Sequence, residues 1–478
     1  MSAVQLCWLR NDLRLHDNQA LWHASQNGPV VVVCMLTPEI WLEHDDAPVK
    51  VDFWRRNLQQ LGERLKALNI PLRLLHSETW STAAQQLLAL AAELDAEALF
   101  FNDEYGVHEQ QRDQAVADAF AAQSRPCQRC TDLILFKPGS LLTQSGTMFK
   151  VYSQFRKQAY QRLHAGLPAC LPAPTTQPDT GIGSDTVPQQ LAGYQAASSL
   201  QQRLWPAGEA AASERLALFT EQIMADYDSA RDRPDVDGTS RLSAYLVCGA
   251  LSPRQCLHAA IAANQGEFDS GNPGAVTWVN ELLWREFYKH ILVCYPRVSQ
   301  HRAFRPDMQR VPWRQDPEAL AAWQQGRTGI PIIDAAMRQL LATGWMHNRL
   351  RMLSAMFLTK NLLIDWQQGE RWFMRHLIDG DLAANNGGWQ WSASTGTDSA
   401  PYFRIFNAVT QSRKFDPQGD FIRTWVPEIK HLSTKHIHQP PVDDLFSSTD
   451  YPPPVVDLSQ SRRRALDVFK RLGEQHDG

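Results

Sequence analysis

Four apolar runs in the first 135 residues alternate with segments of helical periodicity. We expect buried strands at Val4–Leu9, Val30–Leu36, Leu72–Leu75 and Ala98–Asn102, and amphipathic helices at Phe53–Leu68 and Thr82–Leu94. Strands that alternate with helices form a parallel sheet with helices on both faces. The sequence therefore predicts an α/β domain with a doubly wound parallel sheet over residues 1–135.

Charged residues follow the first of these strands. Arg10, Asp12, Arg14, Asp17 and Asn18 come at the carboxyl end of the strand, where open α/β sheets bind ligands. Two interpretations stay open, since these side chains could bind a ligand or pair with each other. Neither a G-x-G-x-x-G motif nor a P-loop is present, which disfavours an NAD dehydrogenase or a nucleoside triphosphatase.

The rest of the chain divides into two further parts. Residues 136–205 are predicted to be an interdomain connector, because five prolines and no sustained periodicity are found from Gly166 to Ser198. Residues 206–478 have a helical pattern and are predicted to form an all-α domain. Ser252 and Pro253 suit a helix start, and Gly249 suits a helix end. A last helix is expected at Gln460–Leu472, closed by Gly473.

Composition limits the class of protein. The longest apolar run is too short to span a membrane, and no secretory signal is visible. Eight cysteines in 478 residues do not suggest a disulfide framework, and the lone Cys127/Cys130 pair is interpreted as two ordinary thiols, so no metal site is expected. We therefore expect a cytoplasmic protein with no membrane partner.

Net charge is −4 over the whole chain but is unevenly distributed. Residues 281–360 hold 12 Lys and Arg against 6 Asp and Glu, which gives +6 in this segment and −10 elsewhere. A local basic surface suits a phosphate backbone even when the total charge is negative. An ordinary set of solvated helices is the alternative interpretation.

The stretch Asp379–Asn407 combines carboxylates, amides and hydroxyls with large aromatic residues. Nine of the sixteen tryptophans lie between Trp278 and Trp391. Apolar walls with a few polar groups are typical of a pocket for a flat ligand with polar edges. Two helical faces have the same mixed character: Glu281, Trp284, Arg285 and Tyr288 on one, and Trp345, Asn348, Arg349 and Met352 on the other. Basic residues interleaved with aromatics suit a nucleic acid with exposed bases; ordinary helix packing is the alternative.

Several motifs in this order resemble those of the DNA photolyase/cryptochrome family. They are WLRNDLRLHDN, GTSRLS, NELLWREFY, GWMHNRLRM and DGDLAANNGGWQWSASTGTD, and the similarity covers essentially the whole chain. The resemblance implies an antenna-binding α/β domain, a connector and a helical domain that binds FAD and DNA. It is strongest to bacterial class I photolyases, which act on cyclobutane pyrimidine dimers.

Three positions separate the family's branches. Asn348 and Met352 stand where (6-4) photolyases have His, and Asn385 stands where plant cryptochromes usually have Asp and animal ones Cys. No cryptochrome-like signalling tail is expected. The resemblance thus implies a light-dependent DNA-repair lyase in which excited reduced FAD passes an electron to the dimer. A cryptochrome-like photoreceptor, a (6-4) photolyase and a flavin-free nucleic-acid-binding protein are the alternatives.

The resemblance also implies roles for individual residues. FAD would be bound by Tyr227, Arg231, Thr239, Ser240, Arg241, Leu242, Ser243, Trp278, Arg285, Arg351, Asp379, Asp381 and Asn385. The dimer and the DNA would be bound by Glu281, Trp284, Asn348, Arg349, Met352 and Trp391. Trp313, Trp366 and Trp389 would carry electrons to oxidised FAD. Residues 239–243 could also be a plain capping cluster at a helix start.

The antenna cofactor is the least constrained expectation. Glu109 matches the position that holds a folate pterin in relatives, while His108 replaces an Asn and Gln300 stands where some relatives have Lys. We expect 5,10-methenyltetrahydrofolate, with 8-hydroxy-5-deazaflavin or an empty site as alternatives. The expected partner is DNA that contains pyrimidine dimers, and the protein is expected to be a monomeric bacterial one.

Overall fold

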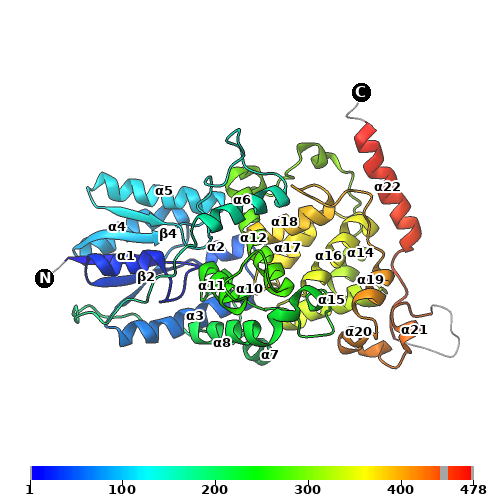
Figure 1. The fold of residues 1–478 in the computed structure, drawn as a ribbon, viewed down its shortest axis with the longest axis horizontal. Helices are drawn as coiled ribbons and strands as arrows, with labels where there is room; N and C mark the ends of the chain where they lie inside the picture. The colour runs from blue at the N-terminus through cyan, green and yellow to red at the C-terminus, as the bar shows by residue number, and fades with distance from the viewer. Residues whose placement is uncertain (1–2, 442–449, 475–478) are drawn as a thin grey trace. The chain divides into compact units, whose positions relative to one another are not determined.

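The computed structural model, drawn as a ribbon in Figure 1, describes residues 3–441 and 450–474. It divides into two compact units. The first unit comprises Met1–Ala225, Ser240–Ser299 and Ile378–Asp381, and the second comprises Asp226–Thr239, Gln300–Leu377 and Leu382–Gly478. The described elements are a five-stranded sheet and helices, so the predicted fold class is confirmed. The domain boundaries drawn from the sequence stay a prediction.

The sheet of the first unit has the strand order β3-β2-β1-β4-β5, and all neighbours are parallel. The strands are β1 (Val4–Leu9), β2 (Val30–Leu36), β3 (Leu72–His76), β4 (Ala96–Asn102) and β5 (Cys127–Cys130). The order reverses at β1, which lies between β2 and β4. Since the chain crosses over at this point, the ends of β1 and β4 form the edge where a doubly wound sheet usually binds ligands.

Alternate side chains of the strands build the core on one face of this sheet. Leu6 and Trp8 of β1 and Leu99 and Phe101 of β4 pack with apolar residues of α4 (Ala83–Glu93) and α5 (Val107–Ala122). Helices α1 (Gln19–Asn27) and α3 (Pro48–Ala67) pack against strands on the other face (Figure 1). A strand buried on both faces needs apolar residues in succession, which explains the continuous run of β2.

The four predicted strands are confirmed, two of them with the same bounds. The two predicted helices correspond to α3 and α4, with α3 starting earlier at Pro48. Helices α1 and α5 and strand β5 were not predicted from the sequence. The remaining helices of this unit are α2 (Pro38–Glu43), α6 (Tyr152–Ala165), α7 (Ser199–Leu204), α8 (Glu209–Leu218), α10 (Ser243–Cys248), α11 (Pro253–Ala263), α12 (Pro273–Cys294) and α13 (Pro296–Ser299), with short turns at Trp80–Thr82 and Phe219–Ile223.

The helix ends around residue 250 follow the local signals, as predicted. Gly249 ends α10 with φ +73°, and a Cβ at this position would overlap the backbone of Asn11. Ser252 caps α11 in a capping box with Gln255. No helix or strand occurs between Gly166 and Ser198, which agrees with the absence of periodicity there.

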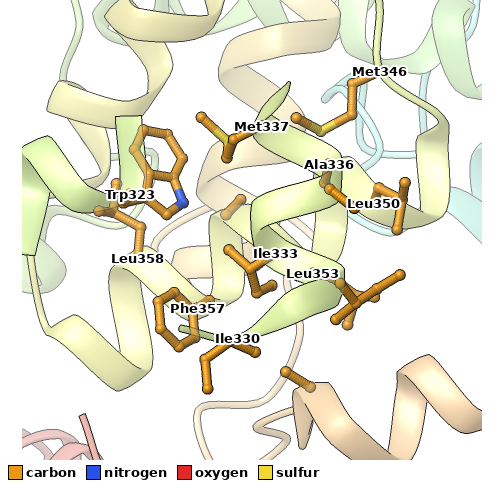
Figure 2. Close-up of a cluster of buried hydrophobic side chains, with 14 of the residues drawn as sticks. Trp323, Ile330, Ile333, Ala336, Met337, Met346, Leu350, Leu353, Phe357 and Leu358 are labelled. Atoms are coloured by element: carbon orange, nitrogen blue, oxygen red, sulfur yellow. The ribbon is translucent and has the colours of Figure 1, made fainter. Parts of the chain in front are cut away.

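The second unit is built from helices around a large apolar cluster, with a smaller one formed by Val311, Leu363 and Phe469. Trp323 of α14 (Pro317–Gln324) packs with residues of α15 (Pro331–Thr343), α16 (Asn348–Met356) and the turn Phe357–Leu362, as Figure 2 shows. The other described helices of this unit are α9 (Tyr227–Ala230), α17 (Trp366–Met374), α18 (Leu382–Ala393), α19 (Ala408–Phe415), α20 (Asp420–Trp425), α21 (Thr434–Ile437) and α22 (Leu458–Glu474), with short 3₁₀ helices at Pro306–Arg310 and Pro427–Ile429. A further 3₁₀ helix, Met224–Asp226, spans the boundary between the units.

Two details of the predicted helical part are wrong. The stretch that begins GWMHNRLRM is not helical throughout, because the His347 ring accepts a hydrogen bond from the Arg349 amide and starts α16 at Asn348. Trp345 therefore precedes the helix and does not share its face. The last helix continues past Gly473 to Glu474, since a glycine weakens a helix without having to end it.

Candidate functional site

The charged residues after β1 pair with one another. The buried guanidinium of Arg14 contacts Asp132 at 2.5 Å, and Arg254 contacts Asp17 at 2.8 Å and Asp132 at 2.7 Å. Burial alone would raise the pKa of Asp132, but Arg14 and Arg254 outweigh it and lower that pKa. The second interpretation of this segment is confirmed, because the charges satisfy each other and link the sheet to α11.

Other charged residues of this edge are also hydrogen-bonded, although burial raises the pKa of Asp12. Asp12 accepts hydrogen bonds from the Arg10 amide (2.7 Å) and the Asn102 side chain (2.6 Å), and Arg10 lies over the Trp8 ring at 4.1 Å. Burial would raise the pKa of Glu104, but Arg112 and Arg10 lower it to about 2. These ion pairs and hydrogen bonds stabilise the sheet edge.

Glu109 and His108 differ from this paired network. Glu109 is half-buried, and burial together with the nearby Glu104 carboxylate raises its pKa to about 7. His108 is exposed, and its ring lies 5.7 Å from the rings of both His44 and Trp80. A carboxyl that exchanges its proton near neutral pH, next in sequence to a residue whose ring contacts two others, can bind a flat polar molecule.

The predicted face of α12 is present. Glu281, Trp284, Arg285 and Tyr288 are all partly exposed, while the neighbouring Leu282, Leu283, Glu286 and Phe287 are buried. The Arg285 guanidinium donates to the Leu133 carbonyl at 2.7 Å. The Trp284 indole stacks on Tyr152 of α6 with ring centroids 3.6 Å apart.

Helix α16 presents its predicted residues to solvent at its first turns. Asn348 is exposed, and Arg349 and Met352 are half-buried. The Arg349 guanidinium makes two hydrogen bonds to Asp232, at 3.2 and 2.6 Å, and lies over the Phe415 ring at 4.5 Å. The expected phosphate ligand Arg349 is thus held by a carboxylate in this structure.

The residues around α10 have the chemistry of a phosphate site. Arg241 has φ +52°, a left-handed conformation that is uncommon for a side chain of this size. The Ser240 carbonyl accepts a hydrogen bond from Arg215 at 2.7 Å, and Ser243 begins α10. In the second unit, Arg231 lies 5.4 Å from the buried Tyr227 ring. Hydroxyls, backbone amides and guanidinium groups of this kind suit a pyrophosphate.

The carboxylates at 379 and 381 lie in the first unit. Asp379 is buried, and Asp381 forms an ion pair with Lys289 of α12. Trp278 is buried against Phe219, with ring centroids 4.9 Å apart. A buried carboxylate accepts hydrogen bonds from N–H groups, so Asp379 fits the ring edge of the flavin that the resemblance implies, whereas the Asp381 carboxylate is already engaged by Lys289.

Asn385 belongs to the second unit and is held on one side only. Its Nδ2 donates to the Glu370 carbonyl at 2.9 Å, and its Oδ1 has no partner among residues 3–441 and 450–474. The amide is therefore fixed with an acceptor to spare, which fits a neutral contact to a flavin. Arg351 donates to the Met346 carbonyl at 2.8 Å, and this bond orients its guanidinium.

The three predicted electron carriers lie in one apolar cluster of the second unit. Trp389 and Trp366 are buried members, and Trp313 packs against the cluster from a partly exposed position. The Trp389 ring makes an edge contact with Phe373 at 5.0 Å, and its Nε1 has no hydrogen-bond partner in the described part of the chain. A Cβ at Gly369 would overlap the Trp389 indole, so this glycine makes space for the ring.

The predicted residues are thus divided between the units. The first unit holds Glu109, His108, Ser240, Arg241, Leu242, Ser243, Trp278, Glu281, Trp284, Arg285, Asp379 and Asp381, and the second holds Tyr227, Arg231, Thr239, Trp313, Asn348, Arg349, Arg351, Met352, Trp366, Asn385, Trp389 and Trp391. Three contacting residues were not found from the sequence: Tyr152, Asp232 and Lys289. Of these, Tyr152 alone had a signal, the YSQFRKQAY pattern with tyrosines eight positions apart.

Other classes of site receive no support. Within the described ranges, no cluster of three His, Cys, Asp or Glu residues could hold a metal ion. None of the described helices is long and apolar enough to cross a membrane.

Comparison with known families gives matches over most of the chain. A model described as "DNA photolyase" matches residues 5–175, and a model described as "FAD binding domain of DNA photolyase" matches residues 278–471. The chain is 43% identical to the deoxyribodipyrimidine photo-lyase of Escherichia coli (strain K12) over 472 residues, which is 98% of each chain. It is 44% identical to that of Salmonella typhimurium over 471 residues, again 98% of each.

Solved structures give the same fold. A bacterial class III photolyase from Agrobacterium tumefaciens has a TM-score of 0.89 and 32% identity, with 99% of this chain and 98% of that chain covered. A cryptochrome from Synechocystis sp. PCC6803 has a TM-score of 0.88 and 28% identity, with coverage of 98% and 99%. Because a photolyase and a cryptochrome match almost equally well, the fold alone does not separate the two activities.

Proposed function

This chain belongs to the DNA photolyase family, and we propose that it uses light to split cyclobutane pyrimidine dimers in DNA into pyrimidine monomers. The observation that carries the proposal is the full-length identity to relatives that bear the name deoxyribodipyrimidine photo-lyase. Asn348 and Met352 support it, since a (6-4) enzyme would be expected to have His at both positions. The reaction breaks carbon–carbon bonds, which makes the protein a lyase.

The chain's FAD-binding region would place FAD among residues that orient it. When bound, FAD supplies the light-excited electron donor for the dimer. Residues 239–243, with Tyr227 and Arg231, would bind the ribose and phosphates. Asp379 and Asp381 would accept hydrogen bonds from flavin N–H groups, and Asn385 would add a contact without charge. Trp278, Arg285 and Arg351 would complete the site.

The lesion would be recognised by polar and aromatic groups together. A dimer lies inside a duplex and must be turned out of the stack before a protein can contact it, and photolyases are known for this base-flipping behaviour. Trp284 and Trp391 would pack against the extruded pyrimidines, and Glu281 would hydrogen-bond their carbonyl or N–H groups. Asn348 and Met352 would line the same site. Arg349 would exchange Asp232 for a DNA phosphate, so binding is expected to weaken with salt.

The three tryptophans would restore the reduced state of the cofactor. Indoles are readily oxidised, and Trp389, Trp366 and Trp313 share an apolar cluster that runs from buried to partly exposed positions. We expect Trp389→Phe to slow photoreduction of the oxidised protein at least about tenfold while pre-reduced protein still repairs dimers. Absorbance under illumination measures photoreduction. Normal photoreduction in this variant would remove Trp389 from the electron path.

A folate antenna is supported by the surroundings of Glu109. The amino and ring N–H groups of a pterin need an acceptor, and the Glu109 carboxyl, with a pKa of about 7, is partly ionised near neutral pH and can accept both hydrogen bonds. The rings of His108, His44 and Trp80 contact one another and would supply aromatic surface for the antenna. 5,10-Methenyltetrahydrofolate is the proposed antenna, and 8-hydroxy-5-deazaflavin would absorb at a different band position in the spectrum of the purified protein.

One assay decides between repair and the alternatives. Purified, reduced protein is illuminated with DNA that contains cyclobutane dimers, and in parallel with DNA that contains (6-4) lesions, with dark samples as controls. Loss of the cyclobutane dimers alone, and only in the light, is the expected result. Loss of (6-4) lesions would favour that class of repair, and no loss of either lesion would favour a photoreceptor. We propose that the protein works on DNA as a monomer in the cytoplasm.

A further inference from the structure

Helix α6 lies in the segment that the sequence marked as a connector, yet it holds one turn of α12. The Tyr152 ring stacks on the Trp284 indole with an interplanar angle of 11° and a centroid separation of 3.6 Å. The Tyr152 phenol donates to the Asn280 carbonyl at 2.7 Å, and the Tyr160 phenol donates to the Asn280 side chain at 2.8 Å. Two phenols, about two helical turns apart, thus donate to the residue that precedes Glu281.

The stack orients Trp284 before any ligand binds. A partly exposed indole on a helix surface has several rotamers, and ordering it during binding reduces affinity. The contact with Tyr152 is close and nearly parallel, while Tyr288 on the next turn lies 5.7 Å away at 30°. Trp284 is nevertheless only half-buried, so part of the indole stays open to a ligand.

The other proposed lesion tryptophan is held differently. Trp391 is also half-buried, but its ring makes no aromatic contact with any residue that the structure describes. Its backbone carbonyl accepts hydrogen bonds from the Ser394 and Ala400 amides, which fix the main chain at this position. The two indoles therefore differ in that only Trp284 is stacked on another aromatic ring among the described residues.

We propose that Tyr152 is a positioning residue for recognition of the dimer. It fixes the plane of the Trp284 indole, so that the extruded dimer packs against a ring that is already ordered. The inference rests on the proposed function, because it requires Trp284 to contact the dimer. It adds α6, through its first residue, to the elements that determine preference for damaged DNA.

The test compares binding to damaged and undamaged DNA in the dark. The FAD-loaded full-length protein is titrated with a duplex that contains one cyclobutane dimer and with the same duplex without it. We expect Tyr152→Leu to lower the ratio of the two affinities about tenfold, with affinity for undamaged DNA and FAD content changed less than about twofold. Tyr152→Phe keeps the ring and should stay within about twofold of the native protein.

Two further variants separate positioning from stability. Tyr160→Leu is the matched control, since it removes the same type of side chain and a bond to the same Asn280 without touching Trp284; less than about a twofold change is expected. Tyr152→His keeps a smaller flat ring and should fall between Phe and Leu. It also keeps the test usable if the Leu variant does not fold.

A double variant tests whether Tyr152 acts through Trp284. In a Trp284→Leu background, Tyr152→Leu should cause no further loss of discrimination. A full additional loss would overturn the proposal, as would equal losses from Tyr152→Leu and Tyr160→Leu. Tighter dimer binding by Tyr152→Leu would also overturn it, because the ring would then compete with the dimer for the indole. If the native protein shows no preference for dimers, the proposed function itself fails.

Discussion

The carboxyl edge of the sheet in the first unit and the tryptophan cluster of the second unit are stabilised in opposite ways. At the sheet edge, buried charges are compensated by opposite charges: Arg14 and Arg254 share Asp132. In the cluster, Trp389 is surrounded by apolar rings, and its N–H has no partner among the described residues. The sheet edge is thus stabilised by ion pairs and the tryptophan cluster by close packing of apolar rings.

This difference separates structural residues from candidates for function. Both regions looked like ligand sites in the sequence, because both combine unusual residue types within a short segment. Charges that satisfy each other in the folded chain have little left to offer a ligand. Groups whose chemistry is not used up inside the fold, such as Glu109, Asn385 and Trp284, are the better candidates.

Removing Asp132 is the most severe way to break the sheet edge. Asp132→Ala leaves the buried Arg14 and Arg254 without their shared carboxylate, and we expect a loss of about 3–5 kcal/mol in the free energy of unfolding. Urea-induced unfolding of the native protein and the variant measures this loss. Asp103→Ala is the control, since its ion pair with Arg129 is partly exposed and should contribute less than about 1 kcal/mol. Similar losses in both variants would show that burial does not matter here.

Filling the space beside Trp389 tests whether shape holds the second region. A Cβ at Gly369 would overlap the indole, so Gly369→Ala should lower the free energy of unfolding by about 1–3 kcal/mol. Gly388→Ala on α18 is the control, because a Cβ there meets no atom within 4 Å. Since alanine favours a helix more than glycine does, this variant should gain about 0.5–1 kcal/mol in the free energy of unfolding. Thermal unfolding measures both. A Trp389→Phe background should relieve part of the Gly369→Ala loss, and unchanged loss would contradict the overlap.

Glu109 sharpens the comparison, because it follows β4 without an ion-pair partner among the described residues. Its pKa is about 7 in the folded chain and lower in the unfolded chain, so the folded state binds the proton more tightly. The resulting stability is present at low pH and is lost as pH rises through about 7. Glu109→Gln should therefore be more stable than the native protein at a pH of about 8.5. The expected difference in the free energy of unfolding is on the order of 1 kcal/mol, because solvent partly screens the half-buried group.

The melting temperature of both proteins between about pH 5 and pH 8.5 checks this expectation. The difference between them should grow as pH increases. A constant difference would mean that Glu109 ionises at its ordinary pKa. Addition of methenyltetrahydrofolate should raise the melting temperature of the native protein more than that of the variant if Glu109 binds the antenna.

Removing the Asp232 carboxylate that holds Arg349 is expected to have the smallest effect of these changes, and the effect should be on affinity for DNA. Asp232→Asn removes the carboxylate that holds this guanidinium, and affinity for DNA should increase about two- to fivefold at low salt, for damaged and undamaged duplexes alike. Fluorescence anisotropy at several salt concentrations measures it. Asp228→Asn is the control, because it removes a charge from the same segment while the Asp232 carboxylate still holds Arg349. Equal gains in both variants would point to net charge alone.

Local patterns in the sequence predicted much of the fold. The apolar runs indicated the first four strands, because a strand buried on both faces must be apolar throughout. Ser252, Pro253 and Gly249 marked helix ends, since caps and left-handed turns depend on a few adjacent residues. The start of α16 was missed because a capping histidine is uncommon.

The candidate site was predicted only as a set of residues. Motif resemblance named the residues for FAD and for the dimer, and their roles stay predictions. The exposed faces of α12 and α16 could be inferred from helical spacing, because residues three and four apart lie on one side. Helical spacing could not show which of these side chains are ion-paired or stacked on another ring.

By itself, the sequence determined the α/β and all-α character of the two parts, the strand positions and the family. Only the tertiary structure decided which charges are consumed inside the fold and which rings are held in place. Arg254 meets Asp17 across 237 positions, and Arg349 meets Asp232 across 117. Tyr152 reaches Trp284 from another helix. Such pairs depend on how distant elements pack, and no local pattern of residues encodes that packing.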